Sequence, residues 1–224
     1  VVLHACCHNP TGADLSEAQW LEVVEVIRAR GLVAFIDMAY QGFADGIEPD
    51  ALALRLFAAS GLQFFVSSSF SKSFSLYGER VGALSIVTAS RDESARVMSQ
   101  VKRVVRTNYS NPPTHGGAVV AAVLASPELR KLWEEELAGM RERIRAMRTG
   151  LVDKLKARGV AQDFAFVARQ RGMFSYTGLT AEQVERLKSE FGIYAVSTGR
   201  ICLAALNTRN LDYVADAIAA VIRK

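Results

Sequence analysis

Hydrophobic and polar positions alternate in blocks along the first part of the chain. Short continuous apolar runs, bounded by turn residues, are typical of strands. The stretches between them place apolar residues at steps of three and four, which predicts amphipathic helices. Continuous apolar strands separated by helices indicate a mostly parallel sheet that is buried on both faces. Strands are expected at 1–5, 32–38, 63–69 and 81–87, and helices at 16–30 and 50–60.

A long helix is expected in the middle of the chain, where residues 91–158 have a mostly helical pattern. It begins at Ser126 and Pro127, because serine is a favourable N-cap and proline fits the first helical turn. Such a helix is long enough to link two domains. Its apolar residues recur at steps of three and four and make it amphipathic: Trp133, Leu137, Met140, Ile144, Met147 and Leu151.

After residue 160 the pattern changes to short strands, expected at 172–178, 193–199 and 200–206. Thr180 and Gln183 form a capping box at the start of one helix, and a last helix begins near residue 211. The predicted fold class is therefore α/β. Residues 1–139 belong to a large domain with a mostly parallel sheet flanked by helices, and residues 140–224 form a smaller α+β domain joined to it by the long helix.

Composition excludes several classes of protein. The 224 residues carry a formal net charge of +4, and basic residues are scattered among acidic ones, so no stripe for nucleic acid is expected. The longest apolar runs are too short to span a membrane. Cys6 and Cys7 are adjacent and Cys202 is remote, which gives neither a disulfide framework nor a zinc spacing. We therefore expect a cytoplasmic protein without a metal site.

Three polar clusters follow predicted strands: HNPTG at 8–12, DMAYQGF at 37–43 and SSSFSKSF at 67–74. In a doubly wound sheet, ligands bind beyond the carboxyl ends of the strands. The three clusters are therefore expected to converge on one rim of the sheet. That convergence indicates a binding site more strongly than any one cluster does.

Lys72 is the candidate nucleophile of this rim. A hydrophobic strand precedes it and Arg80 supplies a nearby cation, and both conditions favour an amine that attacks a carbonyl carbon. Ser69, Ser71 and Arg80 could hold a phosphate through hydroxyl and guanidinium donors. The alternatives are a solvated loop lysine and serines that simply favour turns.

Five further residues are candidates for the site, and two of them have two interpretations. Asp37 ends a strand and either caps a turn or meets a buried cation such as a pyridinium nitrogen, and Tyr40 could reach the same volume. Asn9 stands in a turn sequence. Arg200 precedes an apolar strand and either pairs with a surface group or grips a substrate carboxylate. By composition alone, Arg106 is a surface residue.

Six motifs, in order and over nearly the whole chain, resemble one family. They are HACCHNPTG, IDMAYQGF, SFSKSFSLYGERVGAL, RTNYSNPPTHG, RGMFSYTGL and STGRICLAALNT. The chain resembles the fold-type I, pyridoxal-phosphate-dependent aminotransferases of the aspartate and aromatic-amino-acid subgroup, most closely the bacterial aromatic-amino-acid enzymes. The amino-terminal part of that family is not matched, so the chain is expected to be an inactive fragment when alone.

The resemblance implies pyridoxal 5'-phosphate as cofactor. By this resemblance, Lys72 is the Schiff-base lysine and later the general base, and Asp37 keeps the pyridinium nitrogen protonated. Tyr40 and Asn9 hydrogen-bond the phenolic oxygen of the cofactor ring. The phosphate is bound by Ser69, Ser71 and Arg80.

The resemblance also implies substrates and a partner. Arg200, with Asn9 nearby, holds the substrate α-carboxylate. Arg106 enters the site of a second subunit and meets the distal carboxylate of a dicarboxylic substrate, which requires a homodimer with shared sites. The expected reaction is transamination between an aromatic or dicarboxylic L-amino acid and a 2-oxo acid such as 2-oxoglutarate. Two alternatives stay open: another fold-type I enzyme, such as a β-lyase or decarboxylase, or a non-enzymatic effector-binding module.

Overall fold

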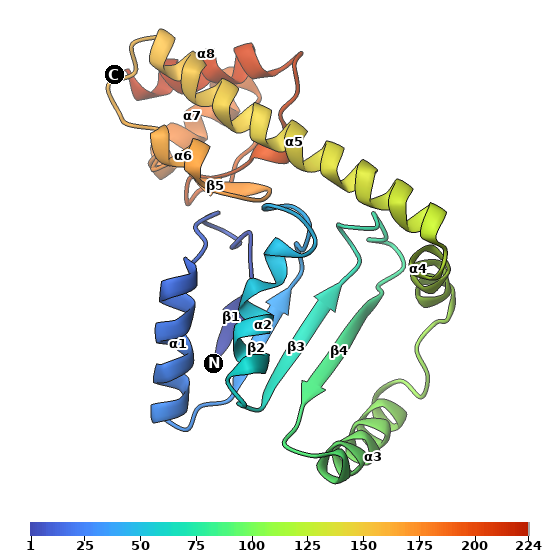
Figure 1. Ribbon diagram of the computed structural model, residues 1–224. Helices are drawn as coiled ribbons and strands as arrows, with labels where there is room; N and C mark the ends of the chain where they lie inside the picture. Colours follow the sequence, from blue (N-terminus) through green and yellow to red (C-terminus); the bar gives the residue numbers. More distant parts are fainter. Residues whose placement is uncertain (224) are drawn as a thin grey trace. The chain divides into compact units, whose positions relative to one another are not determined.

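The computed structural model describes residues 1–223, which pack as two compact units (Figure 1). The division on the long helix falls between Leu137 and Ala138, next to the predicted one at 139/140. Two short early segments, Cys6–Asp14 and Phe43–Asp45, pack with the second unit, which a division along the sequence did not include. The first unit comprises Val1–Ala5, Leu15–Gly42 and Gly46–Leu137, and the second holds the remaining residues.

The first unit is built on a four-stranded sheet in the order β1-β2-β3-β4. The three strands β1 to β3 are parallel, and β4 runs antiparallel to β3. The predicted mostly parallel sheet is therefore confirmed. The strands are β1 (Val2–His4), β2 (Ala34–Met38), β3 (Phe64–Ser69) and β4 (Gly82–Val87).

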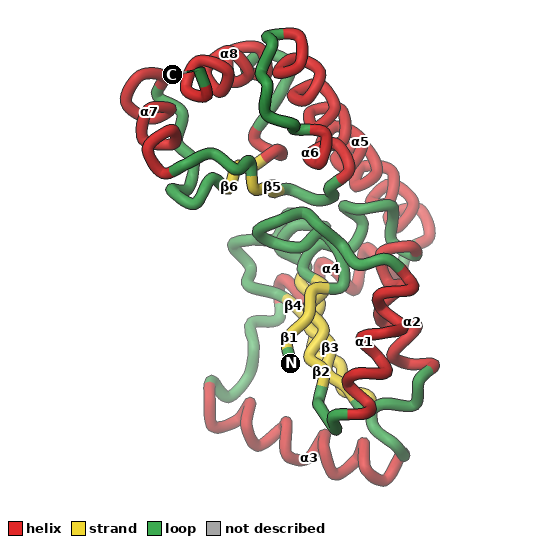
Figure 2. Tube along the Cα trace, turned by 90° about the vertical axis from the view of Figure 1, so that its left-hand side faces the viewer, coloured by secondary structure: helices red, strands yellow, loops and turns green. Residues whose placement is uncertain are grey.

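Helices α1 (Glu17–Ala29) and α2 (Leu52–Ala59) lie side by side on one face of this sheet (Figure 2). The short 3-10 turn η1 (Pro49–Ala51) leads into α2. Trp20 from α1 meets Phe57 from α2 edge-on, with ring centroids 6.3 Å apart, above the buried strand residue Ile36. This apolar layer fixes where β2 and β3 end.

The expected burial of both faces of the sheet is not seen at β4. Its first four residues are exposed in the described part of the chain, and Leu84 keeps 53% of its surface open. An apolar run shows what a strand is able to bury, but it does not show what packs against the strand. The strand itself is therefore confirmed, and its burial on both faces stays a prediction.

The expected helical region, residues 91–158, consists of α3 (Arg91–Asn108), α4 (His115–Ala125) and α5 (Pro127–Ala157). The Ser126 hydroxyl accepts a hydrogen bond from the Leu129 amide at 3.3 Å, which confirms the predicted cap of α5. Since α5 is 31 residues long, it belongs to both units.

The second unit is α+β, with a small antiparallel sheet of β5 and β6. The capping box of Thr180 and Gln183 is present at the start of α7. The predicted strand at 193–199 is wrong, because this segment is a loop that closes in a turn, with the Gly199 amide bonded to the Val196 carbonyl. The elements are α6 (Ala165–Arg169), β5 (Phe174–Tyr176), α7 (Ala181–Phe191), β6 (Arg200–Cys202), η2 (Leu203–Ala205) and α8 (Leu211–Ile222).

Candidate active site

The carboxyl ends of β2 and β3 bring two of the predicted polar clusters together. Asp37 pairs with Ser67 in the parallel register, and the Ser67 hydroxyl donates a hydrogen bond to the Asp37 carboxylate at 3.3 Å. The carboxylate is half-buried at the end of an apolar strand. Asp37 therefore places a carboxylate at the rim of the sheet, as its position in the sequence predicts.

Lys72 lies in the turn after β3, and its amine is enclosed by aromatic rings. The Nζ atom is 4.7 Å from the ring centroid of Tyr40 and 5.7 Å from that of Tyr77. Tyr40 is buried and Lys72 is half-buried. An ammonium group near aromatic faces is stabilised by their quadrupoles. These contacts argue against a solvated loop lysine.

Tyr77 is a site residue that the sequence analysis missed. The only signal was an aromatic residue in the turn five positions after the lysine, and 54% of its surface is exposed. Its backbone carbonyl accepts a hydrogen bond from the Arg80 guanidinium at 2.9 Å. Arg80 and Tyr77 are thereby linked in the second of two turns between β3 and β4, and Lys72 lies in the first.

The serines and Arg80 form the remainder of this cluster. The Ser69 hydroxyl accepts a hydrogen bond from the Ser71 amide at 3.2 Å, and Ser71 is buried. Arg80 is exposed and has a positive φ of 53°, a conformation that costs energy for a residue with a side chain. Hydroxyl, amide and guanidinium donors between the end of β3 and the start of β4 are the groups that bind a phosphate.

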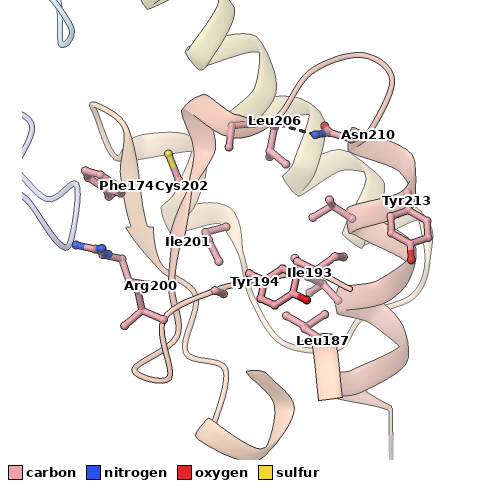
Figure 3. Close-up of a pocket in the computed structure, with 15 residues that line it drawn as sticks. Phe174, Leu187, Ile193, Tyr194, Arg200, Ile201, Cys202, Leu206, Asn210 and Tyr213 are labelled. Carbon is pink, nitrogen blue, oxygen red and sulfur yellow. Dashed lines mark hydrogen bonds between the residues drawn. The ribbon is translucent and has the colours of Figure 1, made fainter. Parts of the chain in front are cut away.

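The second unit holds a separate arginine-centred cluster. Arg200, at the start of β6, donates from Nη1 to the Asn9 side-chain oxygen at 3.1 Å. Its guanidinium carbon lies 4.7 Å from the ring centroid of Phe174 on the neighbouring strand. Figure 3 shows the Arg200 side chain extending away from Tyr194 and Tyr213. The planar fork is oriented by a ring and an amide, as a carboxylate grip requires.

Residues 1–218 match the family model for aminotransferase class I and II. The chain belongs to this family. It is 72% identical over 222 residues to an aspartate aminotransferase of Pseudomonas aeruginosa, and 53% identical to an aromatic-amino-acid aminotransferase of Escherichia coli. It covers 56% of the length of each of these curated relatives, and each match covers 99% of the chain.

Solved aminotransferase structures share this fold. The chain superposes with a TM-score of 0.98 and 74% identity on the aromatic-amino-acid aminotransferase of Burkholderia pseudomallei, a structure with covalently bound pyridoxal phosphate. A mitochondrial aspartate aminotransferase of Trypanosoma brucei gives a TM-score of 0.96 at 46% identity. The matches cover 99% and 98% of the chain, and 56% and 58% of the two solved chains.

Arg106 is not brought to the Lys72 cluster of this aminotransferase chain. It is exposed near the end of α3, and its guanidinium donates to the Ser110 hydroxyl. Figure 1 shows α3 beyond the end of the sheet that is opposite to the arrowheads of β2 and β3. Its predicted role in a second subunit therefore stays a prediction.

Arg148 is a buried cation that the aminotransferase motifs did not reveal. Only 1% of its surface is exposed, and the sequence gives no signal beyond a polar position on an amphipathic helix. Burial lowers the pKa of its guanidinium to about 10. Its donors bond the Ser175 hydroxyl and the carbonyls of Val167, Arg171, Gly172 and Phe174. Arg148 thus fixes the strand that carries the ring beneath Arg200.

The aminotransferase chain has a further pocket in the second unit, of about 590 Å³, between β6 and helices α7 and α8. Its lining is mostly apolar and includes Leu187, Ile193 and Ile218 (Figure 3). Within residues 1–223, no group of histidine, cysteine and acidic side chains is suited to a metal ion. No helix of that same range is long and apolar enough to cross a bilayer.

Proposed function

We propose that the protein containing this chain is a pyridoxal-phosphate-dependent aminotransferase. The observation that carries the proposal is the Lys72 amine, held beside the Tyr40 ring on the rim where β2 and β3 end. Amine, carboxylate and phosphate donors on one rim fit the three polar parts of this cofactor: its aldehyde, its ring nitrogen and its phosphate. The relatives named as aspartate and aromatic-amino-acid aminotransferases support the same reaction.

The residues of the first unit would bind the cofactor and move a proton. When bound, pyridoxal phosphate supplies an electron-accepting ring that stabilises negative charge on the substrate Cα. The Asp37 carboxylate, oriented by Ser67, would hold the ring nitrogen in its protonated form. Lys72 would hold the cofactor through its Nζ atom and, once the substrate amine has displaced it, would carry the proton to and from the substrate Cα on that atom.

Two other groups of side chains would fix the cofactor ring at its ends. Ser69, Ser71 and Arg80 would hold the phosphate, because they carry hydroxyl, amide and guanidinium donors between the end of β3 and the start of β4. Tyr40 and Asn9 would hydrogen-bond the phenolic oxygen. Fixing both ends keeps the reacting atoms in line with the lysine, and orientation of this kind supplies a large share of the rate enhancement.

Arg200 would bind the substrate α-carboxylate with its guanidinium fork. Its contacts with Phe174 and Asn9 already set the plane of the fork, so little side-chain freedom is lost when the carboxylate arrives. The substrates we propose are aromatic and dicarboxylic L-amino acids, with a 2-oxo acid such as 2-oxoglutarate as acceptor. The support is that relatives of both names are close to the chain, at 72% and 53% identity.

A homodimer with shared sites belongs to the same proposal. Arg106 would then meet the distal carboxylate of a dicarboxylic substrate bound to the partner subunit. The proposed location is the cytoplasm. It is supported by the three cysteines, which form no disulfide among the described residues.

The test is covalent trapping at Lys72. The protein containing this chain is mixed with pyridoxal phosphate, reduced with borohydride and digested, and the peptides are analysed by mass spectrometry. We expect a pyridoxyl group on the peptide with Lys72. Lys72→Ala should abolish conversion of 2-oxoglutarate to glutamate, whereas Lys131→Ala, which changes a lysine with 79% of its side chain exposed, should not. Adduct formation elsewhere, or normal turnover by Lys72→Ala, would show the proposal to be wrong.

A further inference from the structure

Trp133 lies on α5, outside every motif that carries the family resemblance. In the sequence it is one more apolar residue of an amphipathic helix. In the structure it is half-buried and reaches the two residues that follow Lys72, although 60 positions separate it from Ser73 along the chain. A side chain so remote in sequence contacts the turn of the candidate nucleophile directly.

The first contact is a hydrogen bond to the backbone of this turn. The Trp133 indole N–H donates to the Ser73 carbonyl at 2.6 Å. Ser73 is 7% exposed, so its carbonyl has little access to water. A buried carbonyl without a partner is costly, and the indole supplies that partner. The bond therefore fixes the peptide group between Ser73 and Phe74, one residue beyond Lys72.

The second contact is an aromatic stack. The rings of Trp133 and Phe74 are stacked, with centroids 4.5 Å apart and planes at 20°. Phe74 in turn meets Phe70 edge-on, with centroids 5.5 Å apart. Both arrangements are favourable for aromatic pairs. Three rings thus hold the ends of the segment that carries Lys72.

The turn has few other supports. Its backbone closes through the Ser75 amide bonded to the Lys72 carbonyl at 3.1 Å and the Phe74 amide bonded to the Phe70 carbonyl at 3.2 Å. The side that faces Trp133 borders a pocket of about 260 Å³, lined in part by Ser69 and Ser73. On this side of the turn, Trp133 supplies both a side-chain hydrogen bond and a ring stack.

We propose that Trp133 is a positioning residue for Lys72. It holds the backbone turn from which the amine projects between the rings of Tyr40 and Tyr77. The inference rests on the proposed function, because Trp133 acts through the lysine that performs the chemistry. A small displacement of that amine slows proton transfer, but it does not change how the substrate carboxylate is bound.

The test uses two substitutions in the holoprotein that contains this chain. Trp133→Phe keeps a ring to stack on Phe74 and removes the hydrogen bond, whereas Trp133→Leu removes both. We expect kcat to fall about threefold to tenfold for Trp133→Phe and about tenfold to a hundredfold for Trp133→Leu. The KM for the amino acid should stay within about twofold of the unsubstituted value, because Arg200 is untouched.

Hydrogen exchange supplies a readout other than activity. The peptide covering residues 70–76 should exchange faster in Trp133→Leu than in the unsubstituted protein, and peptides of α1 and β2 should not. Trp20→Phe is the matched control: Trp20 is 2% exposed in the core of the same unit and packs on Phe57. It should lower the melting temperature and leave both kcat and exchange of residues 70–76 unchanged.

Each outcome decides the inference. An unchanged kcat and unchanged exchange in Trp133→Leu would overturn it, and an inactive Lys72→Ala would show that the proposed function still stands. Faster exchange throughout the first unit would also overturn it, since Trp133 would then be a general stability residue. If Trp133→Leu does not fold, Trp133→Phe decides by the same two measurements. Turnover by Lys72→Ala would instead refute the proposed function itself.

Discussion

At the scale of single residues, two candidate cations, Lys72 in the first unit and Arg200 in the second, are held in different ways. Lys72 keeps a flexible amine between tyrosine rings, with Tyr40 at 4.7 Å and Tyr77 at 5.7 Å. Arg200 keeps a rigid fork, stacked on Phe174 and bonded to Asn9. The difference matches the two tasks: a proton carrier has to move, whereas a carboxylate grip has to stay in place.

Arg200→Lys should therefore weaken substrate binding although the positive charge is kept. A lysine is a point charge that can neither stack on Phe174 nor bond a carboxylate through two parallel N–H groups. We expect the KM for the amino acid to rise about 10- to 100-fold, measured by steady-state kinetics. Arg209→Lys is the control, because Arg209 is exposed in the same unit, and it should leave KM unchanged.

The sequence predicted the positions of candidate site residues best at the ends of strands. Asp37 and Lys72 stand just after apolar runs, and the parallel pairing of β2 and β3 brings their segments to one rim. Arg148 could not be predicted, since its burial depends on carbonyls of a segment that is remote in sequence, 23 to 26 positions further along the chain. Tyr77 and Trp133 were missed because their roles depend on the path of a turn.

At the scale of elements, the turn before β6 ends at Gly199, a glycine that no other residue could replace without strain. Gly199 has a φ of +84°, and a Cβ there would lie 2.7 Å from the Leu179 carbonyl oxygen. Its own carbonyl accepts hydrogen bonds from both the amide and the hydroxyl of Thr177. The turn before Arg200 is thus fixed by backbone geometry.

Gly199→Ala should lower the free energy of unfolding by more than about 2 kcal/mol, because it adds a collision to the strain of a positive φ. Gly192→Ala is the matched control: it has a φ of +63° at the end of α7 and open space around the added carbon. It should cost about 1 kcal/mol. Denaturant unfolding measures both, and equal losses would contradict the role given to the Leu179 contact.

Helices α5 and α8 are joined by surface ion pairs. Arg158 donates to Asp216 at 2.6 Å, and Lys154 donates to Asp212 at 2.6 Å. The hydrogen bond from Arg158 lowers the pKa of Asp216, and the one from Lys154 lowers the pKa of Asp212, below the ordinary value of 3.8. Because these groups are solvent-exposed, each pair should contribute little, and salt should weaken it.

The sign of the pH effect follows from the lowered pKa. The contribution of Asp216 is fully present above its unfolded pKa and is lost as the pH falls through the lower folded value. Asp216→Asn should therefore reduce the melting temperature slightly at neutral pH. At a pH well below the pKa of this carboxylate, the substitution should make no difference to the melting temperature. Asp153→Asn, which changes an exposed aspartate of α5, should have no effect at either pH. A difference between Asp216→Asn and the unsubstituted protein that grows in acid would contradict the assignment.

The sequence also predicted the elements unequally. Apolar runs gave β1 to β4, and caps gave the starts of α5 and α7, because these signals are local. The segment 193–199 has the apolar content of a strand, yet Tyr194 keeps 80% of its surface exposed and the segment ends in a turn. The amino-acid composition of residues 193–199 favours a strand, but among the described residues no neighbouring strand pairs with this segment.

At the scale of the whole molecule, a shared site can be tested by mixing subunits. Lys72→Ala and Arg106→Ala should each be defective with aspartate as substrate. In a mixed dimer, one site would have lost both residues and the other would have lost neither. We therefore expect activity with aspartate to return when the two variants are unfolded and refolded together. If both residues acted within one subunit, the mixture would gain nothing, and assays of the mixture against each variant alone would show it.

The same molecule should tell aromatic substrates from acidic ones through Arg106. An aromatic amino acid has no distal carboxylate. Arg106→Ala should therefore leave the KM for an aromatic substrate within about threefold of the unsubstituted value, while the KM for aspartate rises about tenfold or more. Arg103→Ala is the control, because Arg103 is also exposed on α3. Equal losses for both kinds of substrate would contradict the assigned role.

Segments of the two units alternate along the chain, so the second unit is not one continuous stretch of sequence. A product that starts at Ala138 would lack residues 6–14, whose Gly12 lies against the Phe174 carbonyl and whose Cys7 lies against Gly172. Asp45, which bonds both Arg145 and Arg171, would be lost as well. In this truncated polypeptide, the strand beneath Arg200 would lack these contacts on one side. The second unit is therefore not expected to fold as an independent module.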